Sequence, residues 1–186
     1  MSKITTFQKN EKSILEAAIV VFKNNHAASV EEIIVQAKVS RATFYKFFTS
    51  KQALVVEVAL YSMHHMDELL IEYFIDPNNT AAQKLMYMFE KIIPLSDRYT
   101  FLINFPAVDV DKKVVRYAKQ QRQELSGTIR EAQIDGVLRD DLPMTWILEL
   151  IDMLIYAGWK TLATGEVSLN ETIRLSQAAF QKSTYV

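Results

Sequence analysis

The sequence contains no cysteine, only four glycines and four prolines, and no long uninterrupted apolar run. The absence of cysteine excludes disulfide bonds, thiolate nucleophiles and cysteine metal sites, and is typical of a reducing compartment. Charged or amide side chains interrupt every apolar stretch before it reaches the roughly 18 residues that a membrane span needs. The polar stretch 1–13 lacks the apolar core, about 7 to 15 residues long, of an export signal. We therefore expect a cytoplasmic protein that does not interact with a membrane.

The residues that are present describe a folded chain with an uneven charge. Hydrophobic residues make up 49% and charged residues 23% of the 186 positions, which excludes disorder and allows a core in one or two domains. Residues 1–51 contain eight Lys or Arg and four Glu, a net charge of +4, whereas residues 52–186 contain 13 bases and 18 acids, a net charge of −5. This asymmetry favours a basic N-terminal segment that meets a polyanion.

Almost every segment between the few glycines and prolines has helical periodicity, which predicts an all-α fold. Ser29 followed by Glu32 has the spacing of a capping box, so a helix begins there, and Ser40 caps a second short helix that runs through Phe48. We expect nine helices in two domains, a DNA-binding domain over residues 1–51 and a body over 52–186. The nine expected helices are one that ends near residue 24, those over 29–37, 40–48, 51–75 and 108–135, two that end at Pro94 and Pro106, and two that begin at Pro143 and Ser168.

Two short helices joined by a tight turn, after a supporting helix, are typical of a helix-turn-helix motif that binds double-stranded DNA. The N-terminal residues of its second helix face the base edges, so the forked guanidinium of Arg41 suits a guanine, whereas the ammonium of Lys46 suits a phosphate. Phe44 and Phe48 lie on the opposite side and are expected in the core. The residues expected to contact DNA are Ser29, Lys38, Ser40, Arg41, Ala42, Thr43, Tyr45, Lys46, Phe47 and Lys51.

The segment SVEEIIVQAKVSRATFYKFFTSKQAL, residues 29–54, resembles the DNA-binding domain of the TetR family of bacterial transcriptional regulators. The family pattern of Ser, Thr, an apolar residue, Tyr, Phe and Lys is filled by Ser40, Thr43, Phe44, Tyr45, Phe48 and Lys51. The resemblance covers residues 13 to about 60, and the string from Gly136 to Glu166 also resembles the entry to the family's eighth helix. One departure is Lys38, which stands where the family's turn usually has glycine; a left-handed lysine there costs roughly 1 kcal/mol.

The resemblance implies a nine-helix regulator whose body binds a small molecule and pairs with a second copy. On that basis we expect an apolar or aromatic effector in a pocket formed by Tyr87, Met88, Tyr99, Phe101, Phe105, Tyr117, Trp146, Asp152 and Tyr156, with Arg98 and Asn104 as further polar anchors. We expect the homodimer interface to include Ile147, Leu150, Ile151, Leu154, Gly158, Ile173 and Phe180. A twofold dimer places two recognition helices about 34 Å apart, as a palindromic operator requires. The effector then acts by shifting the helix over 51–75 and so changing this separation.

Other classes of function have less support from the sequence. An alternative is a helical small-molecule-binding or protein-interaction domain that has lost operator recognition. The sequence contains no Gly-rich phosphate loop and no catalytic set of residues, so we do not expect an enzyme or a cofactor. His64 and His65 are neighbours that point about 100° apart on a helix, unlike a zinc pair, so we expect no metal site. The sequence does not determine whether the effector releases the repressor or engages it.

Overall fold

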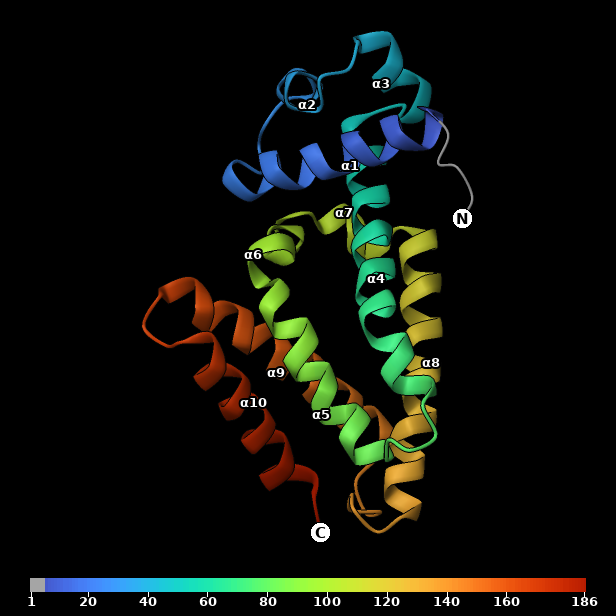
Figure 1. Cartoon of the computed structure of the whole chain (residues 1–186), viewed down its shortest axis with the longest axis vertical. Coiled ribbons are helices and arrows are strands. Elements are labelled where there is room, and N and C mark those ends of the chain that lie inside the picture. Colours follow the sequence, from blue (N-terminus) through green and yellow to red (C-terminus); the bar gives the residue numbers. More distant parts are fainter. Residues whose placement is uncertain (1–5) are drawn as a thin grey trace. The chain divides into compact units, whose positions relative to one another are not determined.

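The computed structural model describes residues 6–186, and all of its regular elements are helices (Figure 1). The α-helices are α1 (Thr6–Asn24), α2 (Val30–Ala37), α3 (Arg41–Phe47), α4 (Lys51–Ile75), α5 (Ala81–Ile92), α6 (Ser96–Tyr99), α7 (Pro106–Val110), α8 (Lys112–Ile134), α9 (Met144–Thr164) and α10 (Leu169–Thr184). Two short 3₁₀ helices, η1 (Ile93–Leu95) and η2 (Thr100–Asn104), flank α6. The predicted all-α fold class is therefore confirmed. None of the helices within the described residues is long and apolar enough to cross a membrane.

The contacts within the chain form two compact units. The first unit comprises residues up to His64 together with Arg98–Val115, and the second comprises His65–Asp97 together with Arg116–Val186. Helices α4 and α8 each contribute residues to both units. The first unit thus extends beyond residue 51, where the sequence analysis ended the DNA-binding domain. It also includes a segment that is distant in sequence, Arg98–Val115.

The core of the first unit joins the three N-terminal helices to that distant segment. Phe22, Phe44 and Leu54, from α1, α3 and α4, are all almost completely buried. The ring of Phe22 also lies 5.9 Å from that of Phe101 and 5.0 Å from that of Phe105, measured between centroids. These aromatic contacts attach η2 and the residue that follows it to α1.

A polar network beside this core connects the same elements. The Glu16 carboxylate on α1 accepts hydrogen bonds from the Tyr61 hydroxyl at 2.6 Å and from Arg98 Nη2 at 2.5 Å. The Nε of Arg98 donates to the Tyr99 hydroxyl at 2.9 Å. Burial by itself would raise the pKa of Glu16, but the hydrogen bonds from Arg98 and Tyr61 outweigh it and hold this pKa below its ordinary value. The charged form of Glu16 is therefore the form that the fold stabilises.

The second unit has its own apolar core, formed where α5, α8, α9 and α10 meet. Phe89 and Phe180 are both fully buried, with ring centroids 5.6 Å apart. Gly158 permits a close approach of α9, because a Cβ there would lie 3.3 Å from the Ile93 side chain and 3.4 Å from a methyl group of Thr172. The Trp159 indole N–H donates to the carbonyl of Ile92 at 3.0 Å, which satisfies a group at the end of α5.

The structure differs from the predicted helices in two places. The segment after Pro94, expected as one helix, consists of η1, α6 and η2, because its short turns bury Tyr99 and Phe101 instead of continuing one axis. The long helix expected over 108–135 is divided at Asp111, which has extended backbone angles (φ −70°, ψ 129°). The Asp111 side chain accepts from the Lys113 amide at 2.8 Å and so begins α8 as a cap.

Candidate nucleic-acid interface

The turn between α2 and α3 has the backbone that the sequence motif requires. The Ser29 hydroxyl accepts from the Glu32 amide, and the Glu32 carboxylate accepts from the Ser29 amide at 2.7 Å, so the predicted capping box is present. Lys38 then adopts the left-handed conformation, with φ 55° and ψ 42°. It is the one non-glycine residue with positive φ among the described residues. The lysine thus occupies a strained position at which glycine carries no steric penalty.

The recognition helix α3 begins at a second serine cap and separates a buried side from an exposed one. The Ser40 hydroxyl accepts from the Thr43 amide at 3.0 Å and lies 2.8 Å from the Thr43 hydroxyl. Phe44 and Phe48 are buried, at 0% and 2% exposure, as the sequence predicts. The predicted contact residues that α3 leaves exposed are Arg41, Ala42, Tyr45 and Lys46; Thr43 and Phe47 are half-buried.

Arg41 is held between an acidic and an aromatic neighbour. Its Nη1 lies 3.4 Å from Glu31 Oε1 on α2, and its guanidinium carbon lies 5.7 Å from the centroid of the Tyr45 ring. The side chains of Arg41 and Glu31 are nevertheless 69% and 58% exposed. The guanidinium is therefore positioned at the start of α3 and remains accessible to a base edge.

Lys51 lies at the start of α4 and contacts the connection between α1 and α2. Its ammonium donates to the carbonyl of His26 at 3.2 Å and lies 5.4 Å from the centre of the Phe22 ring. The Ser50 hydroxyl accepts from the Ala53 amide at 3.0 Å and caps the same helix end. A helix N-terminus with an adjacent ammonium can bind a phosphate oxygen, because an ammonium has three donors and the carbonyl uses one of them.

The residues predicted to line an effector pocket belong to both units. Tyr99 and Phe101 are buried in the first unit, and Phe105 packs on α1. In the second unit, Trp146 and Tyr156 are 59% and 40% exposed. The other predicted lining residues of that unit are Tyr87 and Met88, both half-buried, Tyr117, whose hydroxyl donates to Asp67, and Asp152, which pairs with Arg122.

Of the further anchors, Arg98 is bound to Glu16, and Asn104 is exposed. Aromatic composition does not show which unit buries each ring, and a pocket formed by these residues stays a prediction.

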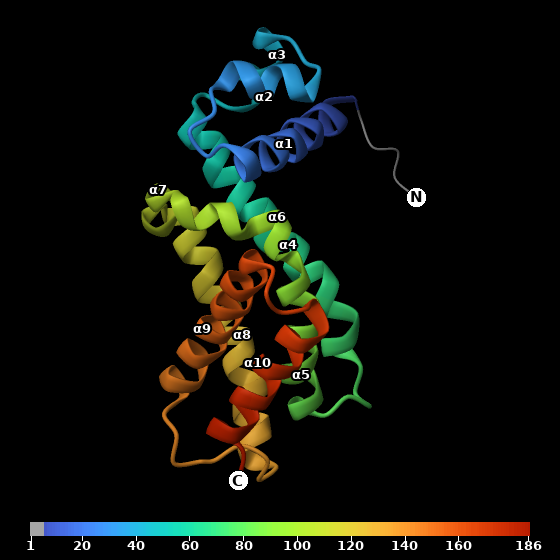
Figure 2. The same cartoon turned by 90° about the vertical axis from the view of Figure 1, so that its left-hand side faces the viewer.

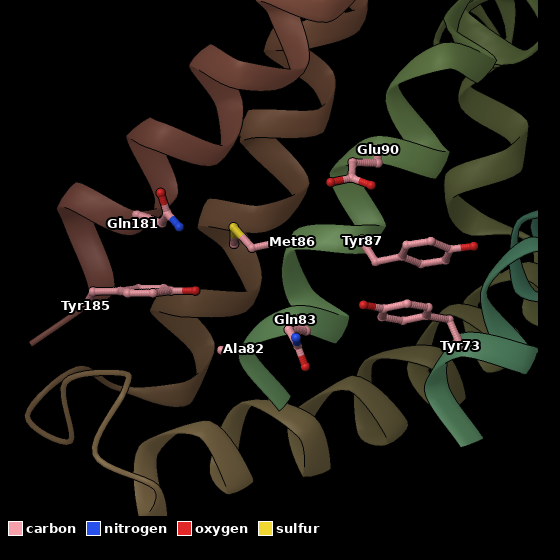
Figure 3. Close-up of a pocket in the computed structure, with 8 residues that line it drawn as sticks. All are labelled: Tyr73, Ala82, Gln83, Met86, Tyr87, Glu90, Gln181 and Tyr185. Atoms are coloured by element: carbon pink, nitrogen blue, oxygen red, sulfur yellow. The ribbon is translucent and has the colours of Figure 1, made fainter. Parts of the chain in front are cut away.

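The second unit contains a groove at a different place, along the outer side of α5 (Figure 3). Its volume is about 320 Å³. The rings of Tyr73, from α4, and Tyr87, from α5, stack on one side with centroids 3.9 Å apart and planes within 8° of each other. The residues that line the groove are Tyr73, Ala82, Gln83, Met86, Tyr87, Glu90, Gln181 and Tyr185. Tyr87 alone among these was predicted.

The predicted dimer residues divide into two groups. Ile147, Ile151 and Phe180 are at most 1% exposed, and Gly158 is buried against Ile93, so these four belong to the core of the second unit. They cannot offer surface to a partner, and their prediction as interface residues was wrong. Leu150, Leu154 and Ile173 are half-buried. The large apolar side chains that α9 and α10 do expose are Trp146, Met153, Tyr156, Leu169 and Leu175.

No group of three or more His, Cys, Asp or Glu side chains within the described residues could hold a metal ion. The site has instead the features of a DNA-binding motif: two capped helices joined by a turn, an exposed arginine and tyrosine on the second helix, and a lysine at the start of the next helix. These features define a helix-turn-helix DNA-binding protein.

Comparisons with known proteins identify the family. Residues 14–58 match the family model described as bacterial regulatory proteins, tetR family. The uncharacterized HTH-type transcriptional regulator YuxN of Bacillus subtilis (strain 168) is 30% identical over 121 residues, which are 62% of this chain and 42% of that protein. The chain thus spans less than half the length of this curated relative.

Solved structures show the same fold. LfrR of Mycobacterium smegmatis, in complex with proflavine, has a TM-score of 0.75 and 16% identity over 92% of this chain and 95% of that one. FadR of Bacillus subtilis, in complex with stearoyl-CoA, has a TM-score of 0.75 and 20% identity over 91% and 95%. Residues 14–58 therefore form a helix-turn-helix DNA-binding domain of the TetR type, and the fold of the chain is that of TetR-like regulators.

Proposed function

We propose that the protein is a dimeric, ligand-responsive repressor that binds a palindromic DNA operator through α3. The arrangement of α3 carries this proposal: its serine cap and buried phenylalanines hold it in place while Arg41, Tyr45 and Lys46 stay exposed on one helix. Arg41 supplies the fork that suits a guanine, and the cations of Lys46 and Lys51 suit phosphates.

The experiment that tests this function is selection of random duplex DNA by the purified protein at about 0.15 M salt, where nonspecific phosphate binding is weakened. We expect enrichment of a palindrome whose half-sites are about 10 base pairs apart, centre to centre. Selection is then repeated with Arg41→Ala, which should lose the preference at one base pair per half-site. If neither form enriches any motif, with or without added cell extract as a source of effector, the protein is not an operator-binding regulator.

The dimer that this function requires is supported by the surface of α9 and α10. These helices pack against each other within the second unit (Figure 2). Together they leave Met153, Tyr156 and Leu175 exposed, at 57%, 40% and 46%. An apolar surface on two neighbouring helices is expected where a second copy packs as a four-helix bundle. Sedimentation of the full chain at several concentrations measures the association directly.

For the effector we propose a planar aromatic molecule that binds in the groove along α5. Three tyrosines and Met86 line this groove, and the Glu90 carboxylate, which accepts from Gln177 Nε2 at 3.1 Å, is its charged group. Stacking on tyrosine favours flat aromatic ligands, and methionine adapts to their shape. A structural neighbour, LfrR, was solved with proflavine.

Proflavine is therefore a suitable first probe for this groove. Its fluorescence should change on titration with the protein and with Tyr87→Phe, which keeps the ring stack, but not with Tyr87→Ala, which removes it. Equal responses from all three proteins would exclude this groove as the binding site. Repeating the DNA selection with proflavine present, on the wild type and on Tyr87→Ala, then shows whether binding in the groove releases or engages the operator, because direct binding of proflavine to DNA affects both proteins equally.

A further inference from the structure

Two adjacent glutamates in the first turn of α2 have different partners. The Glu32 carboxylate turns back to the Ser29 amide as part of the capping box. The Glu31 carboxylate points instead to the recognition helix, where its Oε1 lies 3.4 Å from Arg41 Nη1. The surface beside the start of α3 therefore presents a donor and an acceptor side by side, although a carboxylate by itself repels DNA phosphates.

A G·C base pair presents the matching groups in the major groove. Guanine offers O6 and N7 as acceptors for a forked arginine, and cytosine offers an N4 amino group as a donor to Glu or Asp. O6 and N4 are hydrogen-bonded to each other in the pair, so they lie about 3 Å apart. The second N4–H of cytosine is left free in the groove. The spacing between Arg41 Nη1 and Glu31 Oε1 is close to that between O6 and N4.

We propose that Glu31 and Arg41 read one G·C base pair as a unit. Arg41 donates through Nη1 and Nη2 to O6 and N7 of the guanine, and Glu31 accepts from the free N4–H of the paired cytosine. The assignment rests on the proposed function, in which α3 enters the major groove. It makes Glu31 a specificity-determining residue and fixes which side of Arg41 faces the cytosine.

The pair suits this role because it is preformed and still accessible. The Tyr45 ring, 5.7 Å from the guanidinium carbon, restricts Arg41 on another side, so less side-chain freedom is lost on binding. An ion pair this exposed is only weakly stabilising, and its partners can adjust to a base edge at little cost. On a C·G or an A·T pair Glu31 would face an acceptor or a methyl group and oppose binding, which is how a charge provides specificity. On a T·A pair the adenine N6 amino group could still donate to Glu31, but Arg41 would lose the two guanine acceptors.

The test uses the operator obtained by selection and replaces cytosine by N4-methylcytosine, one position at a time, in one half-site. The methyl group keeps base pairing and occupies the free N4–H position. For the wild type we expect one cytosine at which the replacement weakens binding at least about 5-fold, the effect of losing a contact of about 1 kcal/mol. For Glu31→Ala the same replacement should change binding less than about 2-fold. In the opposite strand, 7-deazaguanine should weaken binding at the paired guanine, and this loss should disappear in Arg41→Ala.

Glu32→Gln is the matched control, because it removes the same charge from the same helical turn, and glutamine can keep the capping box. It should respond to N4-methylcytosine as the wild type does. The assignment is overturned if no cytosine shows the effect, or if Glu31→Ala and Glu32→Gln lose it equally, which would indicate a general charge effect. If no operator is enriched at all, the proposed function fails and this assignment fails with it. An operator without N4 sensitivity refutes the assignment alone.

Discussion

The two units expose side chains of different kinds. In the first unit, the short helix α3 buries two phenylalanines and directs Arg41, Tyr45 and Lys46 to solvent. In the second, the long helix α9 exposes Trp146 and Met153 instead. Cations and hydrogen-bond donors at helix termini suit a polyanion, whereas an apolar stripe on a long helix suits another apolar surface. The difference indicates that the units have different partners. Each of the following substitutions tests the role of one unit.

The largest effects are expected from the two cores. Phe44→Ala and Phe89→Ala remove fully buried rings from the first and second unit, and each should lower the free energy of unfolding by about 3 to 5 kcal/mol. Both tryptophans of the chain, Trp146 and Trp159, lie in the second unit. Tryptophan fluorescence therefore reports unfolding of that unit alone.

If the units unfold separately, Phe89→Ala shifts the fluorescence transition in urea and Phe44→Ala leaves it near the wild-type midpoint, while circular dichroism detects both losses. Retention of DNA should be abolished by Phe44→Ala. Identical fluorescence transitions for the two variants would show instead that the chain unfolds as one cooperative unit. The two units would then differ in their exposed surfaces but not in their stability.

The next effect is on association of the second unit. Met153→Asp places a charge on the exposed apolar surface of α9, and burial of an unpaired carboxylate should weaken the dimer by about 100-fold or more. Ile75→Asp is the matched control, because Ile75 is 70% exposed at the end of α4 and lies outside the proposed interface. Sedimentation velocity distinguishes the variants. If both variants dissociate equally, or if neither dissociates, the result argues against a dimer through α9 and α10.

On the DNA side, the expected effects are smaller and depend on sequence. Arg41→Ala should reduce discrimination at one base pair by about 5- to 150-fold, the range of a good bidentate contact. Lys46→Ala should instead weaken binding to all sequences and reduce the dependence on salt, because a phosphate contact carries no base preference. Titrations of operator and scrambled duplexes at two salt concentrations separate the two patterns. A uniform loss in both variants would contradict base reading by Arg41.

The DNA-binding motif could be predicted from sequence because the contacts that build it are local. The caps at Ser29 and Ser40 each join residues three positions apart, and the burial of Phe44 follows from helical periodicity. The surroundings of the aromatic residues could not be predicted from sequence, because Tyr99 packs in the first unit through partners that are distant in sequence, such as Ser62. Likewise, the apolar periodicity of α9 shows that Ile147 packs against an apolar surface. It does not show whether that surface belongs to the same chain or to a second copy.

A modest effect concerns the polar network of the first unit. Because the pKa of Glu16 is lowered in the folded protein, its contribution to stability is present above the pKa of the unfolded chain and is lost as pH falls through the folded value. Glu16→Gln should therefore destabilise the protein at pH 7 by about 1 kcal/mol, a figure discounted for the partial exposure of the pair. The difference from wild type should shrink at pH 3 in urea unfolding. A difference that does not depend on pH would contradict an ionised Glu16.

The smallest effect concerns the turn itself, where Lys38 occupies a left-handed conformation. Lys38→Gly should raise the free energy of unfolding by about 0.5 to 1 kcal/mol, since glycine adopts positive φ without the Cβ penalty but is more flexible in the unfolded chain. Lys38→Ala keeps the penalty and removes the same cation, so it isolates the charge. If both variants weaken nonspecific DNA binding equally, the lysine contacts phosphate and its strain is offset by that contact. If DNA binding is unchanged in both while only Lys38→Gly is stabilised, the lysine has no role in binding and its sole effect is strain in the turn.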